Sequence, residues 1–275
     1  MSNPTPSLPV RLVAALGARI IGLMLIVGGT TLLFIHTTKW LLRSFVRADV
    51  RLGRQAISAQ IIRVGTRSIA IVMVVSACIG LILAMAMYPP LEQFGQQGTI
   101  ANIVAIAITR ELGPMISAIV LTGFAGASIA AELGTMVVGE EIEALEAHAL
   151  NPLRFLVLPR LVATVISLII LTVMANIVAI LSSAIVTTSF FGVSWQVYMD
   201  NTFDQLGTMD LATGMIKAAT FAVILASLAC YNGLRVSGGA AGVGKATTDT
   251  VVQTIVSVII VDMMFTTVFL QLGWT

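Results

Sequence analysis

The chain has 275 residues, of which 57% are hydrophobic and only 10% are charged. Soluble domains carry about 25% charged residues, so this composition excludes an ordinary soluble protein and indicates a polytopic membrane protein. The formal net charge of +2 is too small to indicate a nucleic-acid partner.

Apolar runs long enough to cross a bilayer, which takes about 20 helical residues, follow one another along the chain. The first run, 20–35, is short and contains three glycines, so it predicts either a span or an interfacial helix. The five further runs that predict membrane spans are 68–87, 100–138, 161–191, 211–231 and 251–270. Because the second of these is nearly twice as long as a bilayer is thick, we expect a break or kink at Gly113-Pro114.

Lys and Arg are distributed unequally among the connections between these runs. Seven lie in residues 39–67, whereas the connections 89–99 and 192–210 contain none. By the positive-inside rule, the basic segment is cytoplasmic and the C-terminus lies outside. The same rule favours an interfacial first helix, because a spanning one would place Arg11 and Arg19 outside.

These observations predict an all-α polytopic membrane protein. It has an N-terminal interfacial (elbow) helix, five transmembrane helices and a short cytoplasmic helix between the second and third spans. Residues 1–67 are expected to form the N-terminal tail, interfacial helix and basic cytoplasmic segment, and residues 68–275 the membrane domain.

Four ionisable residues lie inside predicted spans: Arg110, Glu111, Lys217 and Asp262. A charge at the bilayer centre costs roughly 3 kcal/mol on insertion scales, so we interpret the four as a polar network lining a cavity. A purely structural set of buried ion pairs is the alternative. Adjacent helical residues point about 100° apart, so we expect Glu111 to pair with Lys217, and Arg110 with Asp262 or a lipid phosphate.

Two further features of the 100–138 run are interpreted as structural. Residues 123–131 are nearly all small, and such a run lets a neighbouring helix approach closely. Glu132 lies near the cytoplasmic end of the run, where an interfacial or structural carboxylate is expected.

An acidic amphipathic helix is predicted from residue 140 to 150, where Asn151-Pro152 stops it. A solvated loop would be equally acidic, but the apolar residues spaced along the segment favour docking to a partner. The residues expected to take part are Glu140, Glu141, Glu143, Leu145, Glu146, His148, Asn151, Pro152 and Arg154.

Motifs for catalysis are weak in this chain. Residues 239–246 resemble a P-loop, but Ala246 replaces the hydroxyl that would hold magnesium, so we interpret the glycines as a flexible cytoplasmic connection. His36 and His148 are isolated, and we expect no catalytic residue, no metal site and no cofactor. Cys78 and Cys230 lie far apart in apolar runs, and neither a disulfide nor a metal site is expected from them.

Several short motifs together resemble the MlaE/YrbE family, the permease subunits of ABC transporters that work with MCE-domain proteins. The similarity extends from about residue 62 to 274. The motifs that carry it are Arg110-Glu111-Leu112-Gly113-Pro114, Ala131-Glu132-Leu133-Gly134, Asn151-Pro152-Leu153-Arg154, Gly192-Val193-Ser194-Trp195, Lys217, Asn232-Gly233 and Asp262.

This resemblance implies a homodimeric permease in a bacterial inner membrane of the Gram-negative type, or less readily in the chloroplast inner envelope. It implies a separate ABC ATPase subunit, a periplasmic MCE-domain protein and, in some systems, a small STAS-domain protein. The implied substrate is phospholipid. The four intramembrane residues correspond to the family's polar cavity, and the acidic helix to the element that couples the permease to its ATPase.

Three alternatives remain open from the residues alone. The first is a proton-coupled secondary transporter that uses Glu111, Asp262 and Lys217 as a relay. The second is an intramembrane enzyme acting on lipids, which the lack of a nucleophile–base pair disfavours. The third is a scaffold that only holds other subunits.

Overall fold

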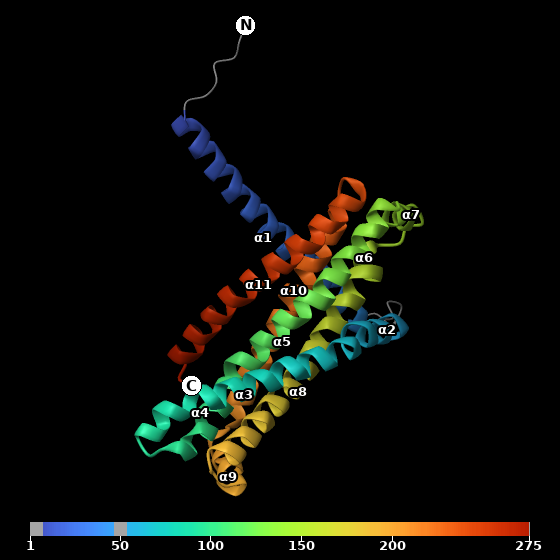
Figure 1. Cartoon of the computed structure of the whole chain (residues 1–275). Coiled ribbons are helices and arrows are strands. Elements are labelled where there is room, and N and C mark those ends of the chain that lie inside the picture. The colour runs from blue at the N-terminus through green and yellow to red at the C-terminus, as the bar shows by residue number, and fades with distance from the viewer. Residues whose placement is uncertain (1–7, 47–53, 275) are drawn as a thin grey trace.

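The computed structural model describes the backbone of residues 8–46 and 54–274, and within these it contains helices and no strand (Figure 1). The α-helices are α1 (Leu8–Val46), α2 (Arg54–Val64), α3 (Ile69–Gln93), α4 (Ile100–Ala107), α5 (Gly113–Leu121), α6 (Ala127–Val138), α7 (Glu141–Ala147), α8 (Leu158–Phe190), α9 (Trp195–Gln205), α10 (Thr208–Leu234) and α11 (Gly239–Gln271). Three π-helical turns join some of them: η3 (Ile108–Leu112), η4 (Thr122–Gly126) and η5 (Leu153–Val157).

Six helical segments among the described residues are long and apolar enough to cross a membrane. They are Ile20–Arg43, Gln55–Gln93, Gln97–Val138, Leu153–Phe190, Thr208–Leu234 and Gly239–Gln271. The last five overlap the five predicted runs over most of their length. The chain is therefore an all-helical, multi-pass membrane protein.

Helix α1 is a continuous helix of 39 residues, not the short, glycine-broken segment expected from the sequence. Gly29 is a contact point instead of a break: a Cβ placed there would lie 2.4 Å from Cε2 of Tyr231. The Tyr231 hydroxyl also donates to the Leu25 carbonyl at 3.1 Å. Only 6% of the most apolar stretch of α1 is buried, and Figure 1 shows α1 diverging from the other long helices.

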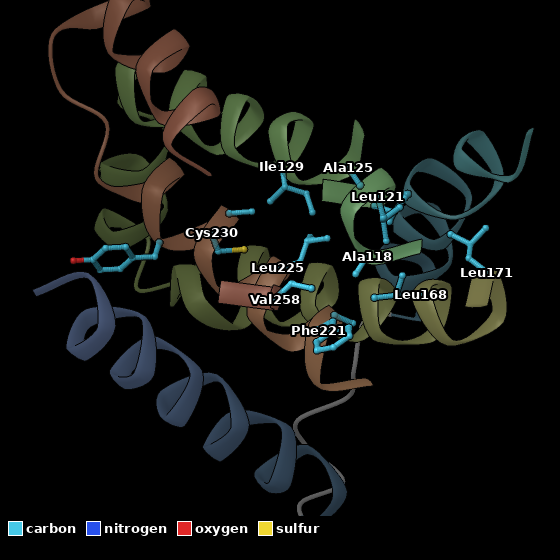
Figure 2. Packing of buried hydrophobic residues seen from close by; sticks show 14 of the residues in the cluster. Ala118, Leu121, Ala125, Ile129, Leu168, Leu171, Phe221, Leu225, Cys230 and Val258 are labelled. Atoms are coloured by element: carbon cyan, nitrogen blue, oxygen red, sulfur yellow. The ribbon is translucent and has the colours of Figure 1, made fainter. Parts of the chain in front are cut away.

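The hydrophobic core lies between α5, α6, α8, α10 and α11 (Figure 2). Apolar side chains from these helices point toward one another in this view; among them are Leu121, Ile129, Leu168, Phe221, Leu225 and Val258. Helix α10 is the most enclosed span, with 56% of its apolar window buried. The core therefore fixes α10, and the side chains on it, against three other spans.

The small-residue run packs against α10, as predicted. Ala130 is fully buried, and a Cβ at Gly233 of α10 would lie only 3.0 Å from the Ala130 carbonyl oxygen. Leu225 of α10 lies in ordinary van der Waals contact with the position of a Cβ at Gly126. Helices α6 and α10 therefore approach closely because small residues face each other between them.

Pro114 does not interrupt the long second predicted span. The Gly113 N–H bonds to the Ile108 carbonyl five residues back, so the chain forms the π turn η3 and Pro114 enters the first turn of α5. A proline in a regular helix would clash with the carbonyl four residues earlier. The sequence predicted a break or kink here. The extra residue of the π turn instead accommodates Pro114 within the helical segment.

Two other predicted boundaries are wrong. Helix α3 continues through Pro89 and Pro90 to Gln93. The glycine-rich stretch 239–246 is helical and forms the first turns of α11, so it is not a flexible connection. Gly242 allows this start, because a Cβ there would lie 2.0 Å from the Ser237 carbonyl oxygen.

Candidate functional site

Lys217 is the centre of a charge cluster between three spans. Helix α10 places it 1% exposed, and its Nζ forms ion pairs with Oε2 of Glu111 and, at 2.9 Å, with Oδ1 of Asp262. Nζ also donates to Oγ1 of Thr266 at 2.8 Å. Two of these contacts, to Glu111 and Thr266, are hydrogen bonds, and the contact with Asp262 is an ion pair. We call Glu111, Lys217, Asp262 and Thr266 the Lys217 cluster.

Thr266 joins the two carboxyl-bearing elements of this cluster. It lies one turn after Asp262 on α11, and its hydroxyl oxygen is 3.0 Å from the Asp262 carbonyl oxygen. The same hydroxyl is 3.1 Å from Oε1 of Glu111. A single hydroxyl therefore bridges η3, α10 and α11 around the Lys217 ammonium.

Arg110 points to a different partner. Its Nε forms an ion pair with Oδ1 of Asp210, the third residue of α10, and the other carboxylate oxygen of Asp210 accepts the Gly207 N–H at 2.7 Å. The predicted Glu111–Lys217 pair is confirmed, whereas the predicted Arg110–Asp262 pair is wrong. The physical reason is that Asp262 already faces Lys217, and Arg110 projects from η3 toward the start of α10. The other partner predicted for Arg110, a lipid phosphate, stays a prediction.

The π turn explains how Arg110 and Glu111 reach α10. A Cβ at Gly214 would lie 2.3 Å from the Thr109 carbonyl oxygen, so α10 touches the backbone of η3 at a position that only glycine fits. Lys217 follows Gly214 by almost one helical turn and therefore faces the same element. π turns are frequent at functional sites, and this one carries Arg110 and Glu111, two of the three charged residues of the 100–138 span.

The electrostatic balance of the two contacts is negative, because three carboxylates face two cations. The Lys217 cluster is not sealed: the Glu111 side chain is 35% exposed and Thr266 is exposed. Such an arrangement holds charged groups in place within an apolar protein. It also gives the Lys217 ammonium two carboxylates with which it can pair in turn. It provides hydrogen-bonding groups for a polar ligand rather than a nucleophile with its base.

Glu132 belongs to a second cluster nearer the α7 end of the bundle. Its Oε1 forms ion pairs with Nη1 of Arg63 at 2.7 Å and with Nη2 of Arg160 at 3.1 Å. Arg160 is 4% exposed and also donates to the Leu156 carbonyl at 2.8 Å. We call Arg63, Glu132 and Arg160 the Glu132 cluster; it links α2, α6 and α8, as expected of a structural carboxylate.

The predicted docking helix is present as α7 but is shorter than expected. It ends at Ala147, because Ala149 adopts a left-handed conformation (φ 58°) and the Leu150 N–H folds back to the Leu145 carbonyl at 3.0 Å. Such a left-handed cap closes a helix without help from a proline. The prediction that Asn151-Pro152 stops the helix is therefore wrong.

Side chains of α7 divide into two faces. Ile142 and Leu145 are half-buried, whereas the four predicted glutamates and His148 are exposed. The acidic face therefore points away from the chain. Residues 140 to 147 project at one end of the bundle in Figure 1, beyond α6.

The remaining predicted docking residues begin the next helical segment. The Asn151 side-chain oxygen accepts the Leu153 N–H at 3.0 Å, and Pro152 precedes the π turn η5. The Arg154 guanidinium lies 5.9 Å from the Trp40 ring centroid, a cation–π contact with α1. This stretch thus connects α7 to α1 and α8.

Sequence reasoning missed Asp210 and Thr266. Asp210 was counted with a polar connection, yet it stands three residues after Gly207 at a helix start, where an acidic side chain caps the backbone. Thr266 is a weaker signal: it lies four residues after Asp262, on the same helical face.

The fold defines a helical multi-pass membrane protein, and the charged residues inside its spans are its candidate functional site. The particular family follows from sequence comparison: residues 57–268 match the family model described as Permease MlaE, and the chain belongs to this family.

Similar proteins come from bacteria and a plant. A probable ABC transporter permease protein of Rickettsia prowazekii is 32% identical over 212 residues, which cover 77% of this chain and 82% of the relative. The intermembrane phospholipid transport system permease protein MlaE of Haemophilus influenzae is 32% identical over 76% of this chain and 80% of its own length. The chloroplastic protein trigalactosyldiacylglycerol 1 of Arabidopsis thaliana is 33% identical over 77% of this chain and 61% of its own length. Permease subunits of ABC transporters are not catalytic, and their ATPase is a separate subunit.

Proposed function

We propose that this chain is the permease subunit of an ABC transporter that moves phospholipids between the inner membrane and a periplasmic MCE-domain protein. Family membership supports an ATP-driven permease, with hydrolysis in a partner subunit. The name of the Haemophilus relative supports phospholipid as the substrate. A small STAS-domain protein that binds the ATPase is a further partner in this proposal.

The Lys217 cluster is the observation that carries the proposal. A buried ammonium held between two carboxylates resists loss of any partner, because an unpaired charge in a membrane is costly. A phospholipid headgroup can replace the partners within such a cluster. Its phosphate would pair with Lys217 or Arg110, and the cation that many headgroups carry would pair with Glu111. Arg110 is suited to phosphate because its guanidinium forms bidentate hydrogen bonds.

The exposed side of the Lys217 cluster is suited to a homodimer interface. Glu111 and Thr266 reach the surface beside apolar, exposed residues of α11 such as Met263, Met264 and Val268. A second copy facing this surface would enclose a cavity with a charged wall. We therefore place the lipid cavity between two copies of the chain.

The proposed topology puts α7 in the cytoplasm, and α9 and the C-terminus outside. Five spans cross the membrane, and α1 lies at the cytoplasmic interface. The divergence of α1 from the bundle supports this arrangement, as does its contact with Arg154 at the α7 end (Figure 1). The exposed acidic face of α7 and the following residues, 151–154, then dock on the ATPase.

The proposal is tested with the purified permease, its ATPase and the MCE-domain protein in vesicles. ATP-dependent transfer of a fluorescent phospholipid to the MCE-domain protein is measured for the wild type and for Lys217→Met. We expect Lys217→Met to lose transfer, and Lys39→Met, which changes an exposed lysine of α1, to keep it. Transfer driven by a pH gradient without ATP would instead support the proton-coupled alternative.

A further inference from the structure

Two adjoining cavities lie away from the Lys217 cluster, between α1 and the α10–α11 pair. The first has a volume of about 280 Å³ and is lined by the end of α10 and the start of α11. The second, of about 590 Å³, follows α11 toward the middle of the bundle. Ile26 of α1 and Gln253 of α11 line both, so the two cavities lie side by side.

The smaller cavity is basic. Arg235 and Lys245 line it together with a single carboxylate, Asp249. The Arg235 guanidinium is held 5.1 Å from the centroid of the Tyr231 ring and bonds to the Tyr231 hydroxyl. Nearby, the Asn232 amide donates to Gln253 at 2.9 Å. The cavity therefore presents a fixed guanidinium and an ammonium, with one excess positive charge.

The larger cavity is lined mainly by apolar side chains. Its walls include Val27 and Phe34 of α1, Val223 and Leu228 of α10, and Val256 and Val261 of α11. From Gln253 to Val261 the wall extends about 12 Å along the helix. Ser227, 2% exposed, lines this cavity, and its hydroxyl has no hydrogen-bond partner among the described residues.

We propose that these adjoining cavities bind a phospholipid, with its phosphate at Arg235 and Lys245 and an acyl chain in the apolar groove. The positive end matches an anionic phosphate, and the groove matches a hydrocarbon chain, which water would fill poorly. The acyl chain lies in the groove between α1 and the α10–α11 pair, so the bound lipid holds α1 against the bundle. The site does not require that the Lys217 cluster moves lipid.

The site is tested by photolabelling in vesicles of phosphatidylcholine that contain a phosphatidylglycerol with a diazirine in one acyl chain. The complete transporter complex is irradiated, and labelled peptides are mapped by mass spectrometry. We expect label on α1, α10 and α11 around Val27, Val223 and Val256. Each basic residue near a membrane surface contributes about fivefold in affinity, so Arg235→Ala with Lys245→Ala lowers this labelling about tenfold or more.

Matched variants separate the site from general effects. Arg67→Ala removes an exposed arginine that lines neither cavity and leaves the labelling unchanged. Val256→Trp fills the groove from a position that is 51% exposed, so the fold is kept while groove labelling is lost. Lys217→Met abolishes transfer but leaves groove labelling intact, which distinguishes failure of this site from failure of the transport proposal.

Three results would overturn the proposal. Equal labelling of exposed α3 residues such as Ile82, insensitive to the Arg235 and Lys245 changes, means that only surrounding bilayer lipid is present. Protection by millimolar inorganic phosphate means that the basic cavity binds free phosphate instead of a lipid. Absence of groove label in the wild type means that another protein surface, such as a second copy of the chain, covers the groove.

Discussion

The Lys217 cluster and the Glu132 cluster use the same kinds of side chain in opposite proportion. In the first, one buried ammonium lies between two carboxylates. In the second, one carboxylate lies between two guanidinium groups. The first joins η3, α10 and α11, and the second joins α2, α6 and α8 nearer the α7 end.

The difference between them indicates which one is poised for exchange. Arg160 is also held by a hydrogen bond to the Leu156 carbonyl in η5, just before its own helix, so the Glu132 cluster keeps its geometry even if one contact breaks. The Lys217 ammonium contacts no backbone atom of its own helix within the described residues, and its partners lie on two other elements. A cation with alternative partners on separate elements is suited to rearrange with a ligand, whereas the Glu132 cluster is suited to clamp helices.

Reversing one charge of the Lys217 cluster should give the largest effect. Glu111→Lys places a second ammonium beside Lys217, and breaking a buried pair costs about 3–5 kcal/mol. We expect loss of lipid transfer and a lower yield of the complex. The double variant Glu111→Lys with Lys217→Glu restores opposite charges and should recover part of both, measured as lipid carried per complex.

Intact lipid binding and transfer in both single reversals, Glu111→Lys and Lys217→Glu, would contradict a functional role for this cluster. The residues would then be structural at most, like those of the Glu132 cluster. The lipid cavity would have to lie elsewhere.

A change on α7 tests the element beyond the Glu132 cluster. Leu145→Arg puts a charge on the half-buried face that seats α7 against the chain, so the acidic face is displaced from the position in which it would meet the ATPase. A buried unpaired charge costs roughly 3–5 kcal/mol. We expect the ATPase to be lost from the purified complex while the permease still inserts. Gln205→Arg, on the exposed surface of α9, is the control; normal ATPase recovery with Leu145→Arg would exclude α7 as the dock.

The spans and the Glu111–Lys217 pair were predictable, because hydropathy and the cost of a membrane charge are properties of a short stretch of sequence. The partner of Arg110 was not, because Asp210 lies just before the apolar run and its inclusion in α10 depends on the cap at Gly207. The Arg110–Asp262 pair was predicted without knowing that Asp262 faces Lys217.

Boundaries set by backbone conformation were also missed. Ala149 ends α7 by adopting a left-handed conformation. Alanine rarely adopts this conformation, so residue preferences could not have predicted that the helix ends there. Gly29 was interpreted as a helix breaker because its partner, the Tyr231 ring, lies about 200 residues away in sequence. Long-range contacts of this kind determine whether a glycine breaks a helix or allows close packing against it.

The distance between α10 and η3 provides a subtler test of the Lys217 cluster. In Gly214→Ala the new Cβ would lie 2.3 Å from the Thr109 carbonyl oxygen, so α10 must move away from η3. This movement increases the distance between Lys217 and Glu111. Overpacking of this type costs about 1–3 kcal/mol. We expect reduced lipid transfer at near-normal expression, whereas Gly123→Ala, with open space around its Cβ, stays at the wild-type rate. Equal transfer by the two variants would show that the cluster tolerates displacement.

Neutralising the Glu132 cluster should have the smallest effect on transport. Glu132→Gln removes the charge that Arg63 and Arg160 share, and Arg160 loses its carboxylate partner. Since Arg63 and Glu132 are partly exposed, solvent screens the loss, and we expect about 1–2 kcal/mol of destabilisation. The melting temperature of the purified complex should fall, while ATP-driven transfer per folded complex stays near the wild-type value. A selective loss of transfer at unchanged melting temperature would mean that Glu132 belongs to the transport path and that the two clusters act together.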